Sequence, residues 1–232
     1  MKKKQARSRP EPDKMLLNNL AEVHRILEIH EELTGPGPGY KPNVGVLNKS
    51  AIVLLVACWE AYIEDLAKTA FDFLLSRAKS HDLFPNKVLT EASKKLRNAI
   101  DQRAVWRLAG EGWKKVLTEH KEDALKRYIG KLNTPKPGQV NELFEELLGI
   151  RSMSSNWHWP GCSVDKATKK LEELVALRGA IAHRVKTSRK VYKRSVERYV
   201  KFINRIAMET SNATRQALLE RTKRAPWQFY SW

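Results

Sequence analysis

The stretch AIVLLVACWEAYI, residues 51–63, is the most apolar part of the chain and decides its fold class. Its apolar residues follow one another without the apolar–polar alternation of a half-buried strand. We expect one long helix that opens at Asn48 or Ser50, is amphipathic in its second half and ends near Ser80. The uninterrupted apolar run, 51–59, is far shorter than the roughly 20 residues of a membrane span. This helix is therefore expected in a protein core.

Helical spacing of apolar residues continues through the rest of the chain. A first helix is expected to begin with Asp13 as its cap and to end at Gly35, before the glycine–proline loop 35–39. The other expected helices cover residues 87–129 with a break near Gly110 and Gly112, 141–148, 165–184 with Asp165 as its cap, and 188–221. No segment alternates like a strand, so the fold class is all-α, a bundle in which two long helices pack on two others.

Length and cysteine content limit the class of protein. A chain of 232 residues can form one good core, and its two cysteines provide neither a disulfide framework nor a zinc site. Low cysteine use suits a reducing compartment, and the basic start leads into Pro10 instead of the apolar core of a signal peptide. We expect a cytoplasmic protein with no membrane partner, consisting of a basic tail (1–12), a helical domain (13–222) and an aromatic tail (223–232).

The positive charge of the chain is concentrated in two segments. The formal net charge is +17; five cations lie within residues 2–9, and thirteen cations against three glutamates lie within 184–224. Such a surplus attracts polyanions, above all nucleic acid, although a basic helix face kept for solubility gives the same composition. The residues expected to follow a phosphate backbone are Arg184, Lys186, Lys190, Arg194, Arg198 and Lys201, with Arg205 next along the same face.

The most specific short motif is LRGAIAHR, residues 177–184. Arg178 falls on an apolar helical stripe, where a long cation must pair with an acid, extend to water or point into a polar cleft. His183 follows five residues later, and an ideal helix sets the two side chains roughly 140° apart. They can meet if the helix frays after Gly179 or if a second copy of the chain contributes. The structural alternative is a buried ion pair for Arg178 and a helix cap at His183.

Glu60 interrupts the apolar stretch and shares a helix face with Val56 and Ile63, which are expected to be buried. A buried carboxylate needs a partner, because removing its charge from water is costly. One hypothesis is that Glu60 orients Arg178 or His183. The other is a structural salt bridge elsewhere, or a position at the rim of the core, and the sequence leaves both open.

Two aromatic segments each allow two interpretations. In the loop Trp157-His158-Trp159, His158 can stack on an RNA base, but loop tryptophans more often plug a bundle, and we favour the plug. The aromatic tail at 226–232 can dock on a partner or fold back onto the bundle, and the sequence does not decide between them.

Three stretches resemble the HEPN superfamily, and in particular its RiboL-PSP branch. Residues 174–183 are similar to the HEPN nuclease motif, an arginine followed after four to six residues by histidine. The loop WHWPG, residues 157–161, resembles the tryptophan-proline loop before the motif helix, and ACWEAYIEDL, residues 57–66, resembles the early acidic helix. The resemblance covers about residues 15–215. It departs at Gly179, where many HEPN nucleases have a polar residue.

The resemblance implies an HEPN-like bundle with two long core helices and additional flanking helices, and a metal-independent endoribonuclease that needs no cofactor. The implied catalytic residues are Arg178, His183 and Glu60, in a homodimer whose two motifs face one cleft. A histidine that is neutral near pH 7 can remove a proton, and an arginine fork can bind the phosphorane. RNA is the implied substrate, and a toxin or phage-defence role with an antitoxin or other regulatory protein is expected. The alternative is a catalytically silent module that binds RNA or a protein.

Overall fold

The computed structural model of the chain describes residues 9–35, 37, 41–131, 135–184 and 190–230. These residues form α-helices and short 3₁₀ helices, and the only β-pairing among them is an isolated bridge between Trp159 and Cys162. The all-α prediction is therefore confirmed. The helices are α1 (Glu11–Thr34), α2 (Gly45–Arg77), η1 (His81–Leu83), α3 (Asn86–Arg97), η2 (Gln102–Leu108), α4 (Gly112–Lys131), α5 (Pro137–Leu148), η3 (Met153–Asn156), α6 (Val164–Arg184) and α7 (Lys193–Thr222).

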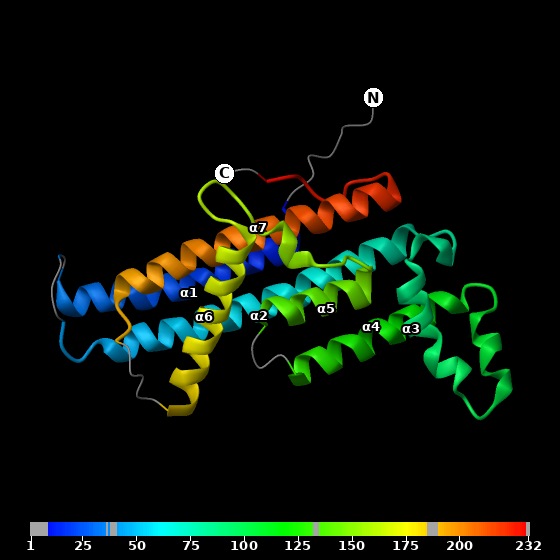
Figure 1. Ribbon diagram of the computed structural model, residues 1–232, viewed down its shortest axis with the longest axis horizontal. Helices are drawn as coiled ribbons and strands as arrows, with labels where there is room; N and C mark the ends of the chain where they lie inside the picture. The colour runs from blue at the N-terminus through cyan, green and yellow to red at the C-terminus, as the bar shows by residue number, and fades with distance from the viewer. Residues whose placement is uncertain (1–8, 36, 38–40, 132–134, 185–189, 231–232) are drawn as a thin grey trace.

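Helix α2 lies at the centre of the bundle. Helices α1 and α7 run beside it, α6 crosses it, and α5 packs against it (Figure 1). A broad arc of its surface, which includes Ile52, Leu55, Trp59 and Ile63, is fully buried. Each such side chain contributes about 1.5–3 kcal/mol when it leaves water. With 33 residues in α2 and 30 in α7, these are the two long core helices that the sequence predicts.

The starts of the first two helices differ from the prediction. Helix α1 begins at Glu11, so Asp13 lies inside it and does not cap it; its carboxylate instead accepts hydrogen bonds from Tyr62 and Ser211. Helix α2 begins at Gly45, so neither of the expected opening residues opens it. The Asn48 side chain instead donates to the backbone oxygen of Val191, at 3.0 Å. In both places a polar side chain that suits a cap is used for a contact between helices.

Later helix boundaries also shift by a few residues. Helix α5 begins at Pro137, inside the segment expected to be a linker, because proline is favoured in the first turn of a helix. Helix α6 begins at Val164, one residue before the expected cap Asp165. The expected break near Gly110 is wider than predicted, since η2 precedes α4. Helix α7 begins at Lys193, later than expected, and residues 185–189 lie outside the described part of the chain.

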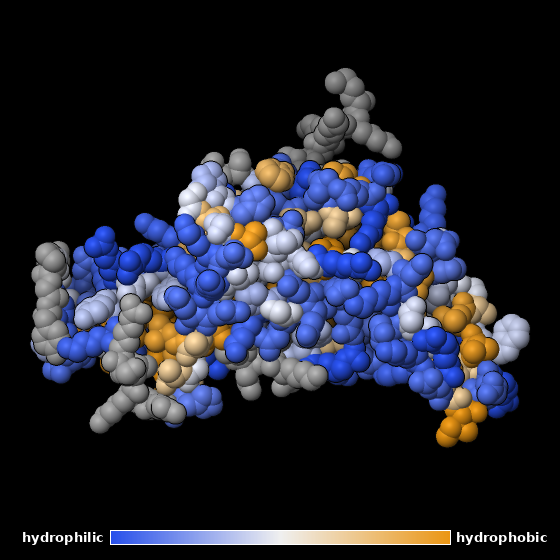
Figure 2. Space-filling model, in the orientation of Figure 1, coloured by the Kyte–Doolittle hydropathy of each residue, from blue (hydrophilic) through white to orange (hydrophobic). Residues whose placement is uncertain are grey.

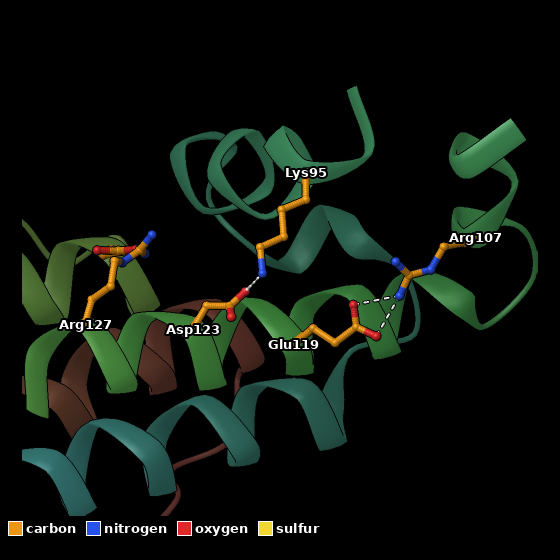
Figure 3. A network of polar contacts seen from close by, with 6 residues as sticks. Lys95, Arg107, Glu119, Asp123 and Arg127 are labelled. Atoms are coloured by element: carbon orange, nitrogen blue, oxygen red, sulfur yellow. Dashed lines mark hydrogen bonds and ion pairs between the residues drawn. The ribbon is translucent and has the colours of Figure 1, made fainter. Parts of the chain in front are cut away.

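Ion pairs connect α3, η2, α4 and α5 at the outer end of the molecule (Figure 3). Lys95 of α3 pairs with Asp123 of α4, Arg107 of η2 donates to both carboxylate oxygens of Glu119 at 2.6 Å, and Arg127 of α4 pairs with Glu146 of α5. The three cations are 74%, 47% and 55% exposed, so each pair contributes at most about 1 kcal/mol. These pairs orient the outer helices more than they stabilise them.

The face of the molecule that Figure 2 shows is mainly hydrophilic, and one group of apolar side chains on it lies at the outer end that contains η2. Ile100 and Trp106 are the most exposed large apolar residues there. Helix α2 passes the length and composition test for a membrane span, yet 50% of the residues in its apolar window are buried inside the fold. A central core helix of a bundle passes the same test, and the packing of α2 fits that assignment.

The aromatic tail folds back onto α7 over the described residues 225–230. Trp227 is buried, and the backbone oxygen of Trp227 accepts a hydrogen bond from Arg215 Nε at 2.9 Å. The side-chain amide of Asn212 donates to the Tyr230 oxygen at 2.8 Å and accepts from the Tyr230 nitrogen at 3.0 Å. Of the two interpretations of this segment, the structure supports packing on the bundle.

Candidate active site

The motif helix α6 crosses α2 and buries one stripe of its surface in the core (Figure 1). Leu171, Leu174 and Val175 on this stripe are almost completely buried. Arg178 lies on the same stripe by helix geometry and is only partly buried, so its guanidinium interrupts an otherwise apolar contact surface. The long cation therefore lies at the edge of the interface between α6 and α2, where a polar partner is required.

Glu60 of α2 provides a negative charge that acts on Arg178. Val56 and Ile63 beside it are fully buried, as expected, and Glu60 lies partly buried at the edge of the same arc. Burial raises the pKa of Glu60, and the positive charge of Arg178 partly offsets this rise. Within the described residues neither side chain makes a hydrogen bond or an ion pair. The two groups interact through space and both keep hydrogen-bonding capacity for a third group.

Glu64 lies one helical turn after Glu60 and was not singled out from the sequence. Burial and the neighbouring charges of Glu60 and Asp65 raise the pKa of Glu64 to about 7. A carboxyl group with this pKa is partly protonated at neutral pH, which suits proton exchange. The signal was available as two glutamates four residues apart in a mostly apolar helix, since such spacing places both on one face.

His183 lies on a different face of α6 from Arg178. The helix continues without a break to Arg184, so the hypothesis that it frays after Gly179 is wrong. An uninterrupted helix sets the two side chains roughly 140° apart, and His183 is exposed while Arg178 is directed to α2. A single chain therefore does not bring Arg178 and His183 onto one face.

The exposed face of α6 around His183 carries small side chains. Helix geometry puts Ala176, Gly179 and Ala180 on this face, and the alanines are exposed. A methyl group added at Gly179 would meet no atom within 4 Å. Small side chains allow another helix to approach closely, because the side chains at the contact set the distance between helix axes. The structure thus leaves this face open beside the histidine.

The expected basic face is only partly described. Arg194, Arg198 and Lys201 are exposed on α7, and Lys190 is exposed just before it. The side chain of Arg184 and the whole of Lys186 lie outside the described residues. Arg205 does not belong to the exposed face: it pairs with Glu209 at 2.9 Å and lies over the ring of Trp159, 5.5 Å from its centroid. The inclusion of Arg205 in that face was therefore wrong.

The tryptophan loop before α6 plugs the bundle. Trp157 is fully buried, donates from Nε1 to Thr210 Oγ1 at 2.9 Å, and packs edge-on against Trp59 with ring centroids 6.0 Å apart. His158 is exposed beside it. Because Trp59 directly precedes Glu60, this contact anchors the segment before α6 to the turn of α2 that carries the carboxylate. The preference for a plug over an exposed stacking surface is confirmed for Trp157.

No three histidine, cysteine, aspartate or glutamate side chains gather as a metal site in the described part of the chain. Neither a search of curated proteins nor one of solved structures returned a match. The RiboL-PSP-HEPN family model matches residues 18–216, which include Glu60, the tryptophan loop, Arg178 and His183. The match covers most of the chain and agrees with the helical architecture, and the chain therefore belongs to the RiboL-PSP-HEPN family.

Proposed function

We propose that this protein is a metal-independent endoribonuclease in which Arg178 and His183 act on the RNA and Glu60 positions Arg178. The observation that carries the proposal is that the charge of Arg178 on α6 acts on Glu60 of α2 although the two make no ion pair, in a chain that a HEPN family model matches. A cation in a purely structural role is expected to bind its carboxylate directly, because leaving both partly buried and open costs free energy. This arrangement leaves the guanidinium fork available to a phosphate.

The residue types account for each proton transfer and for the charge that develops in RNA cleavage. The RNA 2′-hydroxyl loses its proton to a neutral histidine, its oxygen forms a bond to the adjacent phosphorus, and the bond from phosphorus to the 5′-oxygen breaks. The leaving oxygen takes up a proton from an acid. A guanidinium that stays charged can bind two equatorial oxygens of the intermediate, where negative charge increases. The products are a 2′,3′-cyclic phosphate and a 5′-hydroxyl.

A dimer is part of the proposal, because one chain holds Arg178 and His183 on separate faces. Two copies of α6 that meet through the face with Ala176, Gly179 and Ala180 would bring two His183 side chains together. In this arrangement each long Arg178 side chain has to reach the shared cleft from the edge of the interface between α6 and α2. One histidine then serves as base and the other as acid. Light scattering at micromolar concentration should report a dimer. A monomer that still cleaves RNA would exclude the composite site.

The substrate strand is proposed to follow the exposed cations of α7. Arg198 and Lys201 project from this helix after the motif helix ends, and their charge attracts phosphates regardless of base sequence. Many family members of this kind act as growth-arresting toxins or phage-defence effectors, and we propose the same role here, with an antitoxin or other regulatory protein as partner. A cytoplasmic location is part of this proposal.

A second candidate function is a catalytically silent module that binds RNA or a protein. It is favoured by Gly179, which puts no polar side chain directly after Arg178, and by the separation of Arg178 from His183 within one chain. Both candidates predict RNA binding. Only the nuclease predicts new RNA ends.

The experiment that separates them is incubation of the purified full chain with total cellular RNA in excess EDTA. We expect cleavage products with 2′,3′-cyclic phosphate ends, and far fewer products with Arg178→Lys, which keeps the charge but loses the bidentate fork. Lys126→Glu, an exposed change on α4, is the control and should cleave like wild type. RNA that is bound but stays intact would favour the silent module.

A further inference from the structure

The segment between α3 and α4, which contains η2, projects from the outer end of the molecule (Figure 1). Every residue from 100 to 111 except Ala104 is exposed. Four of these exposed side chains are large and apolar, and we call them the apolar tip: Ile100, Val105, Trp106 and Leu108. Folding leaves this group in water although its burial would be favourable, and an exposed apolar patch of this kind marks an interaction site.

The apolar tip occupies two sides of η2. In a 3₁₀ helix, side chains three residues apart lie on the same side. Val105 and Leu108 therefore share one side, Trp106 lies on a second, and Arg107 lies on the third. Arg107 holds this third side to α4, because it donates to both carboxylate oxygens of Glu119 (Figure 3). The segment is thus fixed to the fold on one side and apolar on the two sides that face water.

The shape and size of the projecting segment limit what can cover the apolar tip. A stable protein interface takes roughly 20–30 residues from each partner, which is more than this segment supplies. The surface of a folded partner would also meet one of the two apolar sides and leave the other in water. Lipid chains are fluid, so they surround an inserted segment on every side without a complementary shape. These features favour a lipid surface over a folded protein.

Cations lie around the apolar tip. Residues 94–115 contain seven cations and two carboxylates, Asp101 and Glu111. Five of these cations pair with carboxylates of the described residues. The other two, Arg97 and Lys115, are exposed and pair with no carboxylate in the described part of the chain, and Arg97 donates to the backbone oxygen of Thr90. Each cation near an anionic lipid surface strengthens binding about fivefold, so this surplus favours anionic lipids.

Trp106 has the chemistry of a side chain at the boundary between lipid and water. Its ring is apolar, and its indole N–H can donate a hydrogen bond among the lipid headgroups, which is why tryptophan is enriched at this boundary. It is 75% exposed in the free protein. The apolar tip and its cations therefore provide the two contributions, apolar and electrostatic, that peripheral membrane attachment requires.

We propose that the apolar tip inserts among the headgroups of an anionic lipid bilayer and attaches the protein reversibly to its surface. The sequence led us to expect no membrane partner, because the apolar run 51–59 is too short to span a bilayer. Peripheral attachment needs no spanning helix, and only the structure shows which apolar side chains stay exposed. The proposal does not depend on the proposed nuclease function.

The test is sedimentation of the RNA-free full chain with vesicles of phosphatidylcholine and phosphatidylglycerol. Ile100→Ser with Trp106→Ser should lower the vesicle partition coefficient about ten- to a hundredfold, because two apolar side chains no longer leave water. Both residues are exposed, so the double variant should melt like wild type. Leu33→Ser is the matched control: Leu33 is 68% exposed near the end of α1, and its replacement should leave vesicle binding unchanged.

Salt separates insertion from the attraction of a chain with a net charge of +17 to anionic vesicles. At about 0.5 M NaCl charge attraction is largely screened, so part of the wild type should stay bound and the double variant should be released. Brominated lipid chains should quench wild-type fluorescence more than that of Trp106→Phe, which keeps an apolar ring but loses the reporting indole.

Three results would overturn the proposal. Equal binding of wild type and the double variant at both salt concentrations would mean that charge alone attracts the protein. An equal loss of binding in Leu33→Ser would mean that no particular surface is used. A change in the oligomeric state of the double variant, measured by light scattering without lipid, would make the apolar tip a contact between copies of the chain.

Discussion

Two polar sites lie on different faces of helix α2, and their carboxylates differ in hydrogen bonding. On one face Asp13 accepts from Ser211 Oγ at 3.2 Å and from Tyr62 Oη at 3.1 Å, and Tyr62 shares its one hydroxyl proton with the Ala207 oxygen at 2.8 Å. On the other face Glu60 and Glu64 make no hydrogen bond or ion pair among the described residues. We call the first site closed, because its carboxylate has hydrogen-bond partners, and the second open, because its carboxylates have none among the described residues.

A raised pKa does not distinguish these two sites, but hydrogen bonding does. Burial raises the pKa of Asp13 to about 6 and, with the charges of Glu60 and Asp65, that of Glu64 to about 7. Both oxygens of the Asp13 carboxylate have a partner within the protein, so that site connects α1, α2 and α7. The Glu60 site keeps its capacity for hydrogen bonds and has Arg178 opposite. We infer that the closed site serves stability and the open site serves a ligand.

Among the variants that test this comparison, Arg178→Ala is expected to have the largest effect, and the effect is on the cleavage rate. Loss of a donor to the phosphorane should cost about 3–4 kcal/mol in the transition state, or a hundred- to a thousandfold in cleavage rate. Stability should fall only slightly, because Arg178 makes no hydrogen bond or ion pair with Glu60 and acts on it only through space. Initial cleavage rates and melting curves measure both quantities. A drop of several kcal/mol in stability would instead make the open site structural, and Glu60→Gln in the same background should then restore folding.

Charge reversal on α7 tests whether RNA bound at the open site also contacts the exposed cations of α7. Arg198→Glu with Lys201→Glu should weaken RNA binding and reduce the slope of log affinity against log salt by about one unit for each phosphate that the protein no longer neutralises. Both residues are exposed, so folding should not change. The salt dependence of RNA affinity is the measurement. An unchanged slope would mean that this face does not bind RNA phosphates and serves only solubility.

At the closed site, Tyr62→Phe should act on stability alone. It removes the hydroxyl whose proton is shared between Asp13 and the Ala207 oxygen, which leaves one part-buried and one buried acceptor with fewer donors. The expected loss is about 1–3 kcal/mol of unfolding free energy. Urea unfolding gives this value, and the cleavage rate of the folded variant should match wild type. A folded Tyr62→Phe protein with impaired cleavage would remove the distinction between the two faces of α2.

The smallest effect is the pH dependence of stability from Glu64. Its folded-state pKa of about 7 exceeds the ordinary value of 4.5, so the folded protein binds the proton more tightly than the unfolded chain. Stability contributed by this group is therefore lost as pH rises from 4.5 to about 7. Glu64→Gln should be about 1 kcal/mol more stable than wild type above that range and equal to it below. Equal melting temperatures for both proteins at high pH would contradict the burial of Glu64.

Sequence patterns predicted the elements whose signals are local. The apolar stretch predicted α2, and the position of Trp157 before the motif helix predicted its plug. The patterns failed where a contact between distant segments decides the outcome. Asn48 was expected to open a helix but bonds to Val191, and Asp13 was expected to cap α1 but bonds to Tyr62 and Ser211.

The candidate site was predicted in its parts and not in its arrangement. The motif identified Arg178 and His183, and the apolar face identified Glu60, but only the packing of α6 across α2 brings Glu60 and Arg178 together. Glu64 was missed because its raised pKa depends on burial and on Glu60 together. The pocket between the end of α1 and the starts of α2 and α7 was beyond prediction, because its walls come from three helix ends that are far apart in the sequence.

The most direct test of the central claim is RNA cleavage by His183→Ala in excess EDTA, with melting curves recorded alongside. His183 is exposed, so its removal opens no cavity and the variant should melt like wild type. Removal of a general base typically slows a reaction about a hundred- to ten-thousandfold, and we expect a decrease in that range. Full cleavage by a folded His183→Ala protein, or wild-type cleavage abolished by EDTA, would contradict a metal-independent nuclease site at Arg178 and His183.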